Sequence, residues 1–166
     1  MKEEKAQPVK GEIMEKKPKV LFLSTGNSTR SQIAEGFLHT MTDDHFATVS
    51  AGIESGGLDP VGAEVMEEAG VEIGQHVEDV SQAIKEHFGY VITFYDAARE
   101  RSPTFPFTVN LMRRSVADPV RMAASAGEKK EMFRRVRDEI RDCVSGFVSE
   151  VTQKERERAE QARILG

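Results

Sequence analysis

The stretch VLFLSTGNSTRS, from Val20 to Ser31, constrains the fold more than any other part of the chain. Four apolar residues come first, small polar residues with Gly26 follow, and Arg30 leads into a segment with helical periodicity. This order predicts a buried strand, an anion-binding loop and a helix. Backbone N–H groups of such a loop can point at a tetrahedral oxyanion, while the helix N-terminus and a guanidinium neutralise its charge.

Size and charge narrow the class of protein. The 166 residues, 39% of them hydrophobic, fit one domain with an ordinary core. The net charge of -5 argues against nucleic acid as a partner. The longest apolar stretches, 20–23 and 90–94, are far shorter than the roughly 20 residues that span a bilayer, so we expect no membrane partner. Residues 1–5 lead into no apolar segment of a secretory signal, which predicts a cytoplasmic protein.

Cys143 is the one cysteine of the chain, which excludes an intramolecular disulfide, a dithiol redox pair and a thiolate zinc cluster. We expect the protein to use no cofactor. The cysteine shares helical spacing with an apolar stripe, so core packing is favoured over a reactive thiol. The stripe consists of Phe133, Val136, Ile140, Phe147 and Val151.

Composition divides the chain into three parts. Residues 1–18 are rich in Lys and Glu, lack apolar periodicity and predict a flexible N-terminal tail. Residues 19–151 carry the alternating elements of the domain. Residues 152–166 form a highly charged extension that we expect to fray or to stand in solvent.

The domain alternates between strand and helix patterns. The expected strands are 20–23, 46–51, 90–94 and 107–111, and the expected helices are 31–41, 60–69, 79–87, 96–101 and 127–151. In the first helix, residues 33, 34, 37, 38 and 41 are expected to face inward. This alternation predicts an α/β three-layer sandwich with a four-stranded parallel sheet, in which ligands bind beyond the carboxyl ends of the strands. The loop after the first strand lies there, and it matches neither the dinucleotide fingerprint nor the Walker loop.

The ordered motifs of the chain resemble the low-molecular-weight protein tyrosine phosphatase family, and within it the thioredoxin-coupled arsenate reductases. The resemblance covers roughly residues 19–150 and rests on separated segments: Ser24-x5-Arg30-Ser31-Gln32, Thr25-Gly26-Asn27-Ser28, Ser50-Ala51-Gly52-Ile53-Glu54, Asp118-Pro119 and Phe133-Arg134-Arg135-Val136-Arg137-Asp138-Glu139-Ile140. It implies the low-molecular-weight phosphotyrosine phosphatase fold.

The resemblance also implies functional roles. In the family the first loop residue is a nucleophilic cysteine, the arginine clamps the equatorial oxygens, and the aspartate before proline protonates the leaving group. These positions are Ser24, Arg30 and Asp118 here. The anion-binding loop would comprise Thr25, Gly26, Asn27, Ser28, Thr29, Arg30 and Ser31. Asp118 before a proline also fits turn chemistry, and a hydrogen-bonding role is the alternative for Ser24.

Sulfur is missing from every position where the reductase branch uses it. Thr29 occupies the position of the loop thiol, while Tyr95 and Ser102 fall where the relay pair is expected. A serine hydroxyl is far less acidic than a thiol and needs a general base. His39, His45, His76 and His87 qualify by residue type alone.

Some family members bind a monovalent cation near the loop. Asn27, Glu35, Ser50 and Asp79 resemble parts of that site, but Val77 breaks the match, so the metal remains unknown. The alternative for Asn27 and Ser50 is backbone hydrogen bonding that stiffens the loop.

Two hypotheses follow for function. In the first, the loop binds phosphate, arsenate or a phosphorylated group with lost or altered catalysis. In the second, an active enzyme uses Ser24, or a water molecule assisted by Asp118. Removal of cysteines by engineering is a third possibility, although Tyr95 is an unusual designed replacement and favours natural divergence.

The Arg113-Arg114 pair is interpreted as a solvated patch, with an acidic or phosphorylated partner as the alternative. The sequence leaves the oligomeric state unknown.

Overall fold

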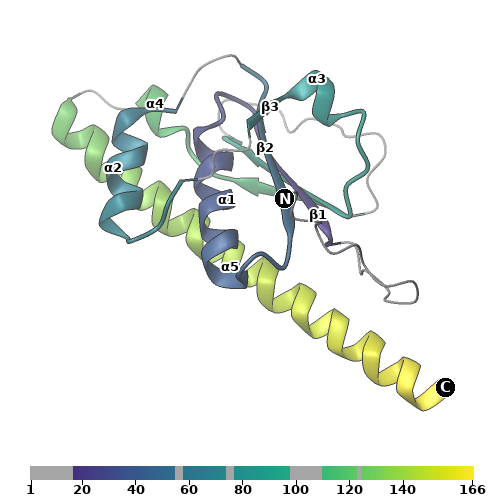
Figure 1. Ribbon diagram of the computed structural model, residues 1–166. Helices are drawn as coiled ribbons and strands as arrows, with labels where there is room; N and C mark the ends of the chain where they lie inside the picture. The colour runs from purple at the N-terminus through teal and green to yellow at the C-terminus, as the bar shows by residue number, and fades with distance from the viewer. Residues whose placement is uncertain (1–16, 55–57, 74–76, 98–109, 123–124) are drawn as a thin grey trace, which may run out of the picture.

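A parallel five-stranded sheet forms the centre of the computed structural model, which describes residues 17–54, 58–73, 77–97, 110–122 and 125–166. The strands are β1 (Lys19–Ser24), β2 (Ala47–Gly52), β3 (Val77–Asp79), β4 (Tyr90–Tyr95) and β5 (Leu111–Ser115). Their order in the sheet is β3-β2-β1-β4-β5, which places β1 at the centre (Figure 1). The α/β class and the parallel sheet are confirmed.

The expected number of four strands is wrong, because β3 adds a fifth strand at one edge. Its residues pair with Ser50 to Gly52 of β2 in parallel register. The sequence Val77-Glu78-Asp79 has a single apolar residue, and Val77 is exposed, so no hydrophobic pattern marks this strand. A three-residue edge strand depends on the hydrogen bonds of its neighbour rather than on buried side chains.

Helices cover the two faces of the sheet unequally. The helices are α1 (Thr29–Thr42), α2 (Pro60–Glu68), α3 (Val80–Ala83), α4 (Pro119–Met122) and α5 (Ala126–Leu165). The larger cluster of buried apolar residues joins alternate residues of β1 and β4, such as Phe22 and Phe94, to α1 and α5. On the other face, Leu21 and Leu23 pack with Ala83 of α3 and with Phe88. The alternation places β1 in both apolar layers.

Several expected boundaries hold. Helix α2 begins at Pro60 after Asp59, whose side chain accepts a hydrogen bond from the Val61 amide, and the chain leaves it at Gly70 with a φ of 71°. The predicted apolar stripe of α5 is buried, and Cys143 is half-buried against it. Core packing is therefore confirmed for this cysteine.

Other boundaries are wrong. The strand expected at 107–111 is observed at Leu111–Ser115, and residues 107–109 lie outside the described part. Its second half, Arg113-Arg114-Ser115, is polar. Polar residues are tolerated there because β5 is an edge strand. The helix expected over 79–87 is only Val80–Ala83, begun by Asp79. Met41 is 37% exposed instead of inward-facing, because it lies in the last turn of α1. Of the helix expected over 96–101, residues 98–101 are not described, and residues 96 and 97 are not helical.

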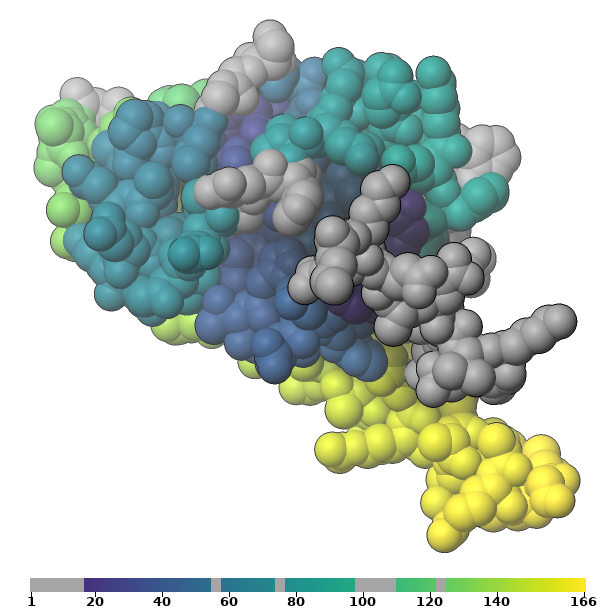
Figure 2. Space-filling model, in the orientation of Figure 1, coloured from purple at the N-terminus to yellow at the C-terminus, as the bar shows by residue number. Residues whose placement is uncertain are grey.

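Helix α5 does not end near Val151 but continues through Leu165, and its last part stands clear of the domain (Figures 1 and 2). Helix-forming residues and ion pairs along its own surface support this part, among them Lys154 with Glu150 at 3.4 Å and Arg163 with Glu160 at 2.6 Å. The extension is therefore helical in the structure and lies in solvent. Among the described residues, neither α5 nor any other helix is long and apolar enough to cross a membrane.

Ion pairs fix α2 against α5. Arg134 donates hydrogen bonds of 3.0 and 2.8 Å to the Glu68 carboxylate, and Lys130 lies 3.4 Å from it. These cations, Arg134 first, lower the pKa of Glu68 to about 2 despite the opposing effect of desolvation. The pair Lys129–Asp59, 2.8 Å apart, joins the same helices near the N-terminus of each. These contacts hold α2 in place against α5.

Candidate oxyanion-binding site

The loop after β1 starts from a fixed point in the centre of the sheet. Ser24 is the last residue of β1 and pairs with Gly52 of β2 on one side and Phe94 of β4 on the other. Beyond the strand, the Thr25 amide donates a hydrogen bond of 3.1 Å to the Phe94 carbonyl, and the Ile53 amide donates one of 3.0 Å to the Ser24 carbonyl. Neighbouring strands therefore hold the start of the loop on both sides.

Two glycines allow other groups to approach the loop closely. A Cβ atom at Gly52 would lie 2.6 Å from the Ser28 backbone nitrogen, so this part of β2 lies directly against the loop. A Cβ atom at Gly26 would lie 2.7 Å from Oδ2 of Asp118 and 3.3 Å from Nη2 of Arg30. At Gly52 the occupied space is backbone and cannot give way, whereas a side chain at position 26 would displace the Asp118 carboxylate.

Short polar side chains brace the loop from within. The Ser31 amide donates a hydrogen bond of 2.9 Å to Oγ of Ser24, and the Thr29 amide donates one of 3.1 Å to Oδ1 of Asn27. The Ser28 hydroxyl bonds to the Gln32 side chain at 2.7 Å, and the Ser31 hydroxyl donates to two carbonyls. The expected loop-stiffening role of Asn27 matches this geometry, and Ser24 makes the kind of contact expected for a hydrogen-bonding residue.

Backbone N–H groups remain available where the loop meets α1. The amides of Gly26, Asn27 and Ser28 donate no hydrogen bond to any residue in the described part of the chain. Helix α1 begins at Thr29 and adds the positive end of its dipole. Consecutive amides at a helix N-terminus form the arrangement that binds phosphate-like anions.

Arg30 and Asp118 meet across this loop. Arg30 is 1% exposed, and its Nη1 donates a hydrogen bond of 2.7 Å to the Val116 carbonyl, while its Nη2 lies 3.8 Å from Oδ2 of Asp118. The Asp118 carboxylate is 6% exposed, and its Oδ1 accepts a hydrogen bond of 3.0 Å from the Val120 amide. The fold therefore brings together the loop, the guanidinium and the carboxylate that the sequence motifs single out.

Sequence reasoning missed Arg121, a second arginine at Asp118. Its Nε lies 3.7 Å from Oδ2 of Asp118, and its Nη2 is bonded to Oε1 of Glu54. Glu54 itself donates a backbone hydrogen bond of 3.1 Å to the Gly26 carbonyl. Asp118 directly precedes the short helix α4, and Arg121 follows it by three residues in sequence; this spacing is the signal that could have revealed the contact.

The histidines considered as general bases lie elsewhere. His39 is near the C-terminal end of α1 and bonds to Asp44 and Thr48, and His45 bonds to Glu155 of α5. Ten residues of helix separate His39 from Thr29, a distance of about 15 Å. His87 is exposed, and residue 76 lies outside the described part. None of the three described histidines is placed to act as a general base for Ser24.

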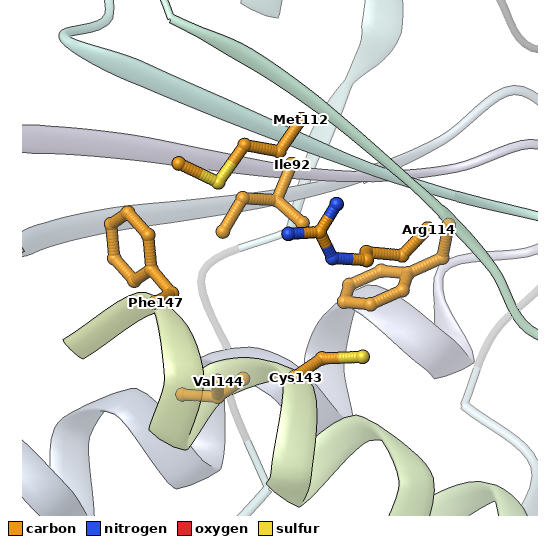
Figure 3. A pocket seen from close by; sticks show the side chains of 7 residues that line it. Ile92, Met112, Arg114, Cys143, Val144 and Phe147 are labelled. Carbon is orange, nitrogen blue, oxygen red and sulfur yellow. The ribbon is translucent and has the colours of Figure 1, made fainter. Parts of the chain in front are cut away.

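Cys143 lies on α5, away from the loop. It borders a hollow with Ile92, Phe94 and Arg114 that leaves no room for a water molecule (Figure 3). Burial raises the pKa of this thiol, and the nearby Arg114 charge opposes the effect only in part. Of the expected relay positions, Tyr95 is the last residue of β4, and residue 102 is not described.

Two of the residues considered for a cation are in direct contact, and a third caps a helix. The Ser50 hydroxyl donates a hydrogen bond of 2.8 Å to the buried Glu35 carboxylate, but Asp79 caps α3 through the Ser81 amide. Hydrogen bonds from Ser81 lower the pKa of the Asp79 carboxyl. In the described ranges, no group of three or more His, Cys, Asp or Glu side chains is placed to hold a metal ion.

The parallel sheet and the loop between β1 and α1 define an α/β protein of the phosphatase-loop class. The family model for low molecular weight phosphotyrosine protein phosphatase matches residues 19–158. The chain belongs to this family.

Relatives within the family include arsenate reductases and a phosphatase. An arsenate reductase of Bacillus licheniformis is 36% identical over 132 residues, covering 79% of this chain and 95% of the relative. One of Staphylococcus aureus is 35% identical over 134 residues, covering 80% and 98%. A solved structure of an arsenate reductase in the phosphate binding state has a TM-score of 0.67 and 28% identity, covering 80% of this chain and 98% of that one. The YwlE arginine phosphatase of Geobacillus stearothermophilus, with a TM-score of 0.65 and 20% identity over 84% of this chain and 96% of its own, shares the fold.

Proposed function

We propose that this protein binds phosphate-type or arsenate-type oxyanions in the loop from Ser24 to Arg30, with catalysis lost or altered. The observation that carries the proposal is the combination of an assembled loop with a serine at its first position. The three available amides, the start of α1 and the buried Arg30 provide the anion site. The similarity to an arsenate reductase in the phosphate binding state supports this ligand class.

Loss of turnover follows from the chemistry of the first position. In a loop of this kind, a thiol is ionised because helix dipole, amides and guanidinium all favour the anion. A serine hydroxyl remains protonated in the same surroundings and needs a base to attack phosphorus. Here Oγ of Ser24 accepts a hydrogen bond from the Ser31 amide, and the described histidines lie elsewhere.

An active enzyme is the second candidate, and the position of Asp118 favours it. The carboxylate lies beside both Gly26 and Arg30, where an acid or base assisting a leaving group or a water molecule would be needed. In this case hydrolysis would depend on Asp118, and either on Ser24 or on direct attack by water.

Calorimetric titration with inorganic phosphate and arsenate, combined with an assay of aryl phosphate hydrolysis, tests both candidates. We expect binding without turnover in the natural sequence, and turnover gained in Ser24→Cys. Because hydrogen bonds to a charged partner contribute about 1.5–3 kcal/mol, Arg30→Ala should weaken binding by about 10- to 100-fold.

Arg113→Ala is the matched control, since it removes the same charge from an exposed position on β5 and should leave binding unchanged. Arg30→Lys retains the charge and guards against misfolding of the alanine variant, and it should also bind less tightly because the planar guanidinium is lost. Turnover in the natural sequence that disappears in Ser24→Ala would favour the enzyme. No oxyanion binding at all would exclude both candidates.

A further inference from the structure

We infer that Glu54 and Arg121 act as positioning residues for Asp118, and that together they set the oxyanion affinity of the loop. This inference rests on the proposed function of the loop. The three side chains form a chain of contacts that we term the clasp: Glu54 to Arg121, and Arg121 to Asp118. The clasp joins the segment after β2 to α4, and both segments border the loop.

The clasp is anchored at both ends. The Glu54 backbone amide is bonded to the Gly26 carbonyl at 3.1 Å, so Glu54 is fixed to the loop itself. At the other end, Asp118 accepts hydrogen bonds from two backbone amides of α4: its Oδ1 from Val120 at 3.0 Å and its carbonyl from Arg121 at 3.2 Å. Arg121 therefore connects the two segments through its side chain.

Oδ2 of Asp118 lies between two guanidinium groups. It is 3.8 Å from Nη2 of Arg30 and 3.7 Å from Nε of Arg121. The same oxygen would lie 2.7 Å from a Cβ atom at Gly26, so the carboxylate sits over the loop. An incoming oxyanion would meet a carboxylate of the same charge beside Arg30 and would bind more weakly than in its absence. A clasp that holds Asp118 in this place therefore lowers the affinity for oxyanions.

Breaking the clasp should free Asp118 to move away from the anion. Glu54→Gln removes the ion pair but retains a side chain of similar shape. Exposed ion pairs contribute about 0.2–1 kcal/mol, which corresponds to an affinity change of up to about fivefold. We expect Glu54→Gln to tighten the binding of inorganic phosphate by about two- to fivefold when Asp118 is present.

A double-mutant cycle separates positioning from simple charge removal. In the Asp118→Asn background, Glu54→Gln should leave the phosphate dissociation constant unchanged, because no carboxylate remains to be positioned. A general effect of the lost Glu54 charge would be equal in both backgrounds, and that result would overturn the inference. Glu155→Gln is the control, since Glu155 is a comparably exposed carboxylate on the distant part of α5, where its Oε1 lies 3.3 Å from Nε2 of His45.

Amide hydrogen exchange tests the clasp without any ligand. The Val120 and Arg121 amides both donate to Asp118, so their exchange reports how firmly this segment is held. We expect exchange to accelerate about two- to fivefold in both Glu54→Gln and Arg121→Gln, and to stay unchanged in Glu155→Gln. Unchanged exchange in the two clasp variants would overturn the inference even if phosphate binds. Accelerated exchange in a protein that binds no phosphate would instead contradict the proposed function.

Discussion

Two regions of the molecule each hold one half of the requirements for thiolate chemistry. Around Ser24, a helix N-terminus, loop amides and the buried Arg30 favour an anion, but the side chain is a hydroxyl. Around Cys143 a sulfur is present, but burial on α5 raises its pKa. The environment that activates a nucleophile and the atom that could be activated therefore lie in different parts of the fold.

The difference shows that this loop has kept its structure without its expected nucleophile. Its hydrogen bonds involve backbone groups and the side chains of Asn27, Ser28 and Ser31, none of which requires sulfur at position 24. The Ser24 hydroxyl accepts a hydrogen bond from the Ser31 amide, and a cysteine sulfur at this position could accept the same hydrogen bond. The hydrogen bonds that shape the loop are thus independent of the atom that would carry out covalent chemistry.

The two regions each contain an arginine, and the first prediction compares them. Arg30→Ala should lower the free energy of unfolding by about 3–5 kcal/mol, because it leaves the buried Asp118 carboxylate and the Val116 carbonyl without this partner. Arg114→Ala, beside Cys143 but exposed, should change it by about 0.5 kcal/mol or less. Urea denaturation followed by circular dichroism measures both. Equal losses would show that Arg30 is not the structural centre of the loop.

A thiol placed in each region provides the second prediction. In Ser24→Cys, combined with Cys143→Ala, we expect the introduced thiol to ionise with a pKa in the range of about 3.5–7.5 that helix N-termini and cations produce. The thiol of Cys143 in the natural sequence should ionise above its ordinary value of 9.0, since burial raises its pKa. This difference between the two thiol pKa values corresponds to a difference of at least about 2 kcal/mol in the free energy of thiol ionisation.

Thiolate absorbance in the ultraviolet measures both ionisations, and the Cys143→Ala protein serves as the blank that subtracts the two tyrosines. The direction of the pH effect on stability also differs. For Cys143 the unfolded thiol ionises first as the pH rises above 9, so the native state loses stability there. For the introduced thiol, stability is gained above the unfolded pKa and lost as the pH falls through the lowered folded pKa. A pKa near 9 at position 24 would mean that the loop does not favour anions.

The motifs located this site because they depend on local sequence. A strand that ends in small polar residues before Arg30 has few other structures available, and the Asp118-Pro119 pair follows the last strand. Contacts between side chains that are far apart in the sequence could not be predicted in this way. Arg121 reaches Glu54 across 67 residues, and neither side chain belongs to a pattern that indicates the other.

Hydrophobic patterns also explain which parts of the fold could be predicted. Buried strands such as β1 and β4 can be recognised in the sequence as apolar runs. The edge strands β3 and β5 carry exposed polar residues and depend on hydrogen bonds to a neighbouring strand. The extension of α5 past Val151 likewise packs no apolar side chain against the domain, and its large apolar residues, Ile164 and Leu165, are exposed. Its helical state comes from residue propensity and ion pairs along the helix, which a search for an apolar face does not detect.

The third prediction compares two glycines, one beside each region, and has the smallest expected effect. Gly52→Ala should lower the free energy of unfolding by about 1–3 kcal/mol, since a Cβ atom there would lie 2.6 Å from the Ser28 backbone nitrogen, which cannot rotate away. Gly146 lies within α5, three residues beyond Cys143, and a Cβ atom there would meet nothing within 4 Å. Gly146→Ala should therefore raise stability by about 0.4–1 kcal/mol through the lower entropy of the unfolded chain.

Phosphate titration of the same two variants extends the comparison from stability to function. Displacement of Ser28 in Gly52→Ala would disturb the available amides of the loop, so phosphate affinity should fall together with stability. Gly146→Ala should bind phosphate as the natural sequence does, because α5 contributes no group to the loop at this position. If Gly146→Ala altered phosphate binding as much as Gly52→Ala, the region around Cys143 would be coupled to the loop, and the separation of the two regions would no longer hold.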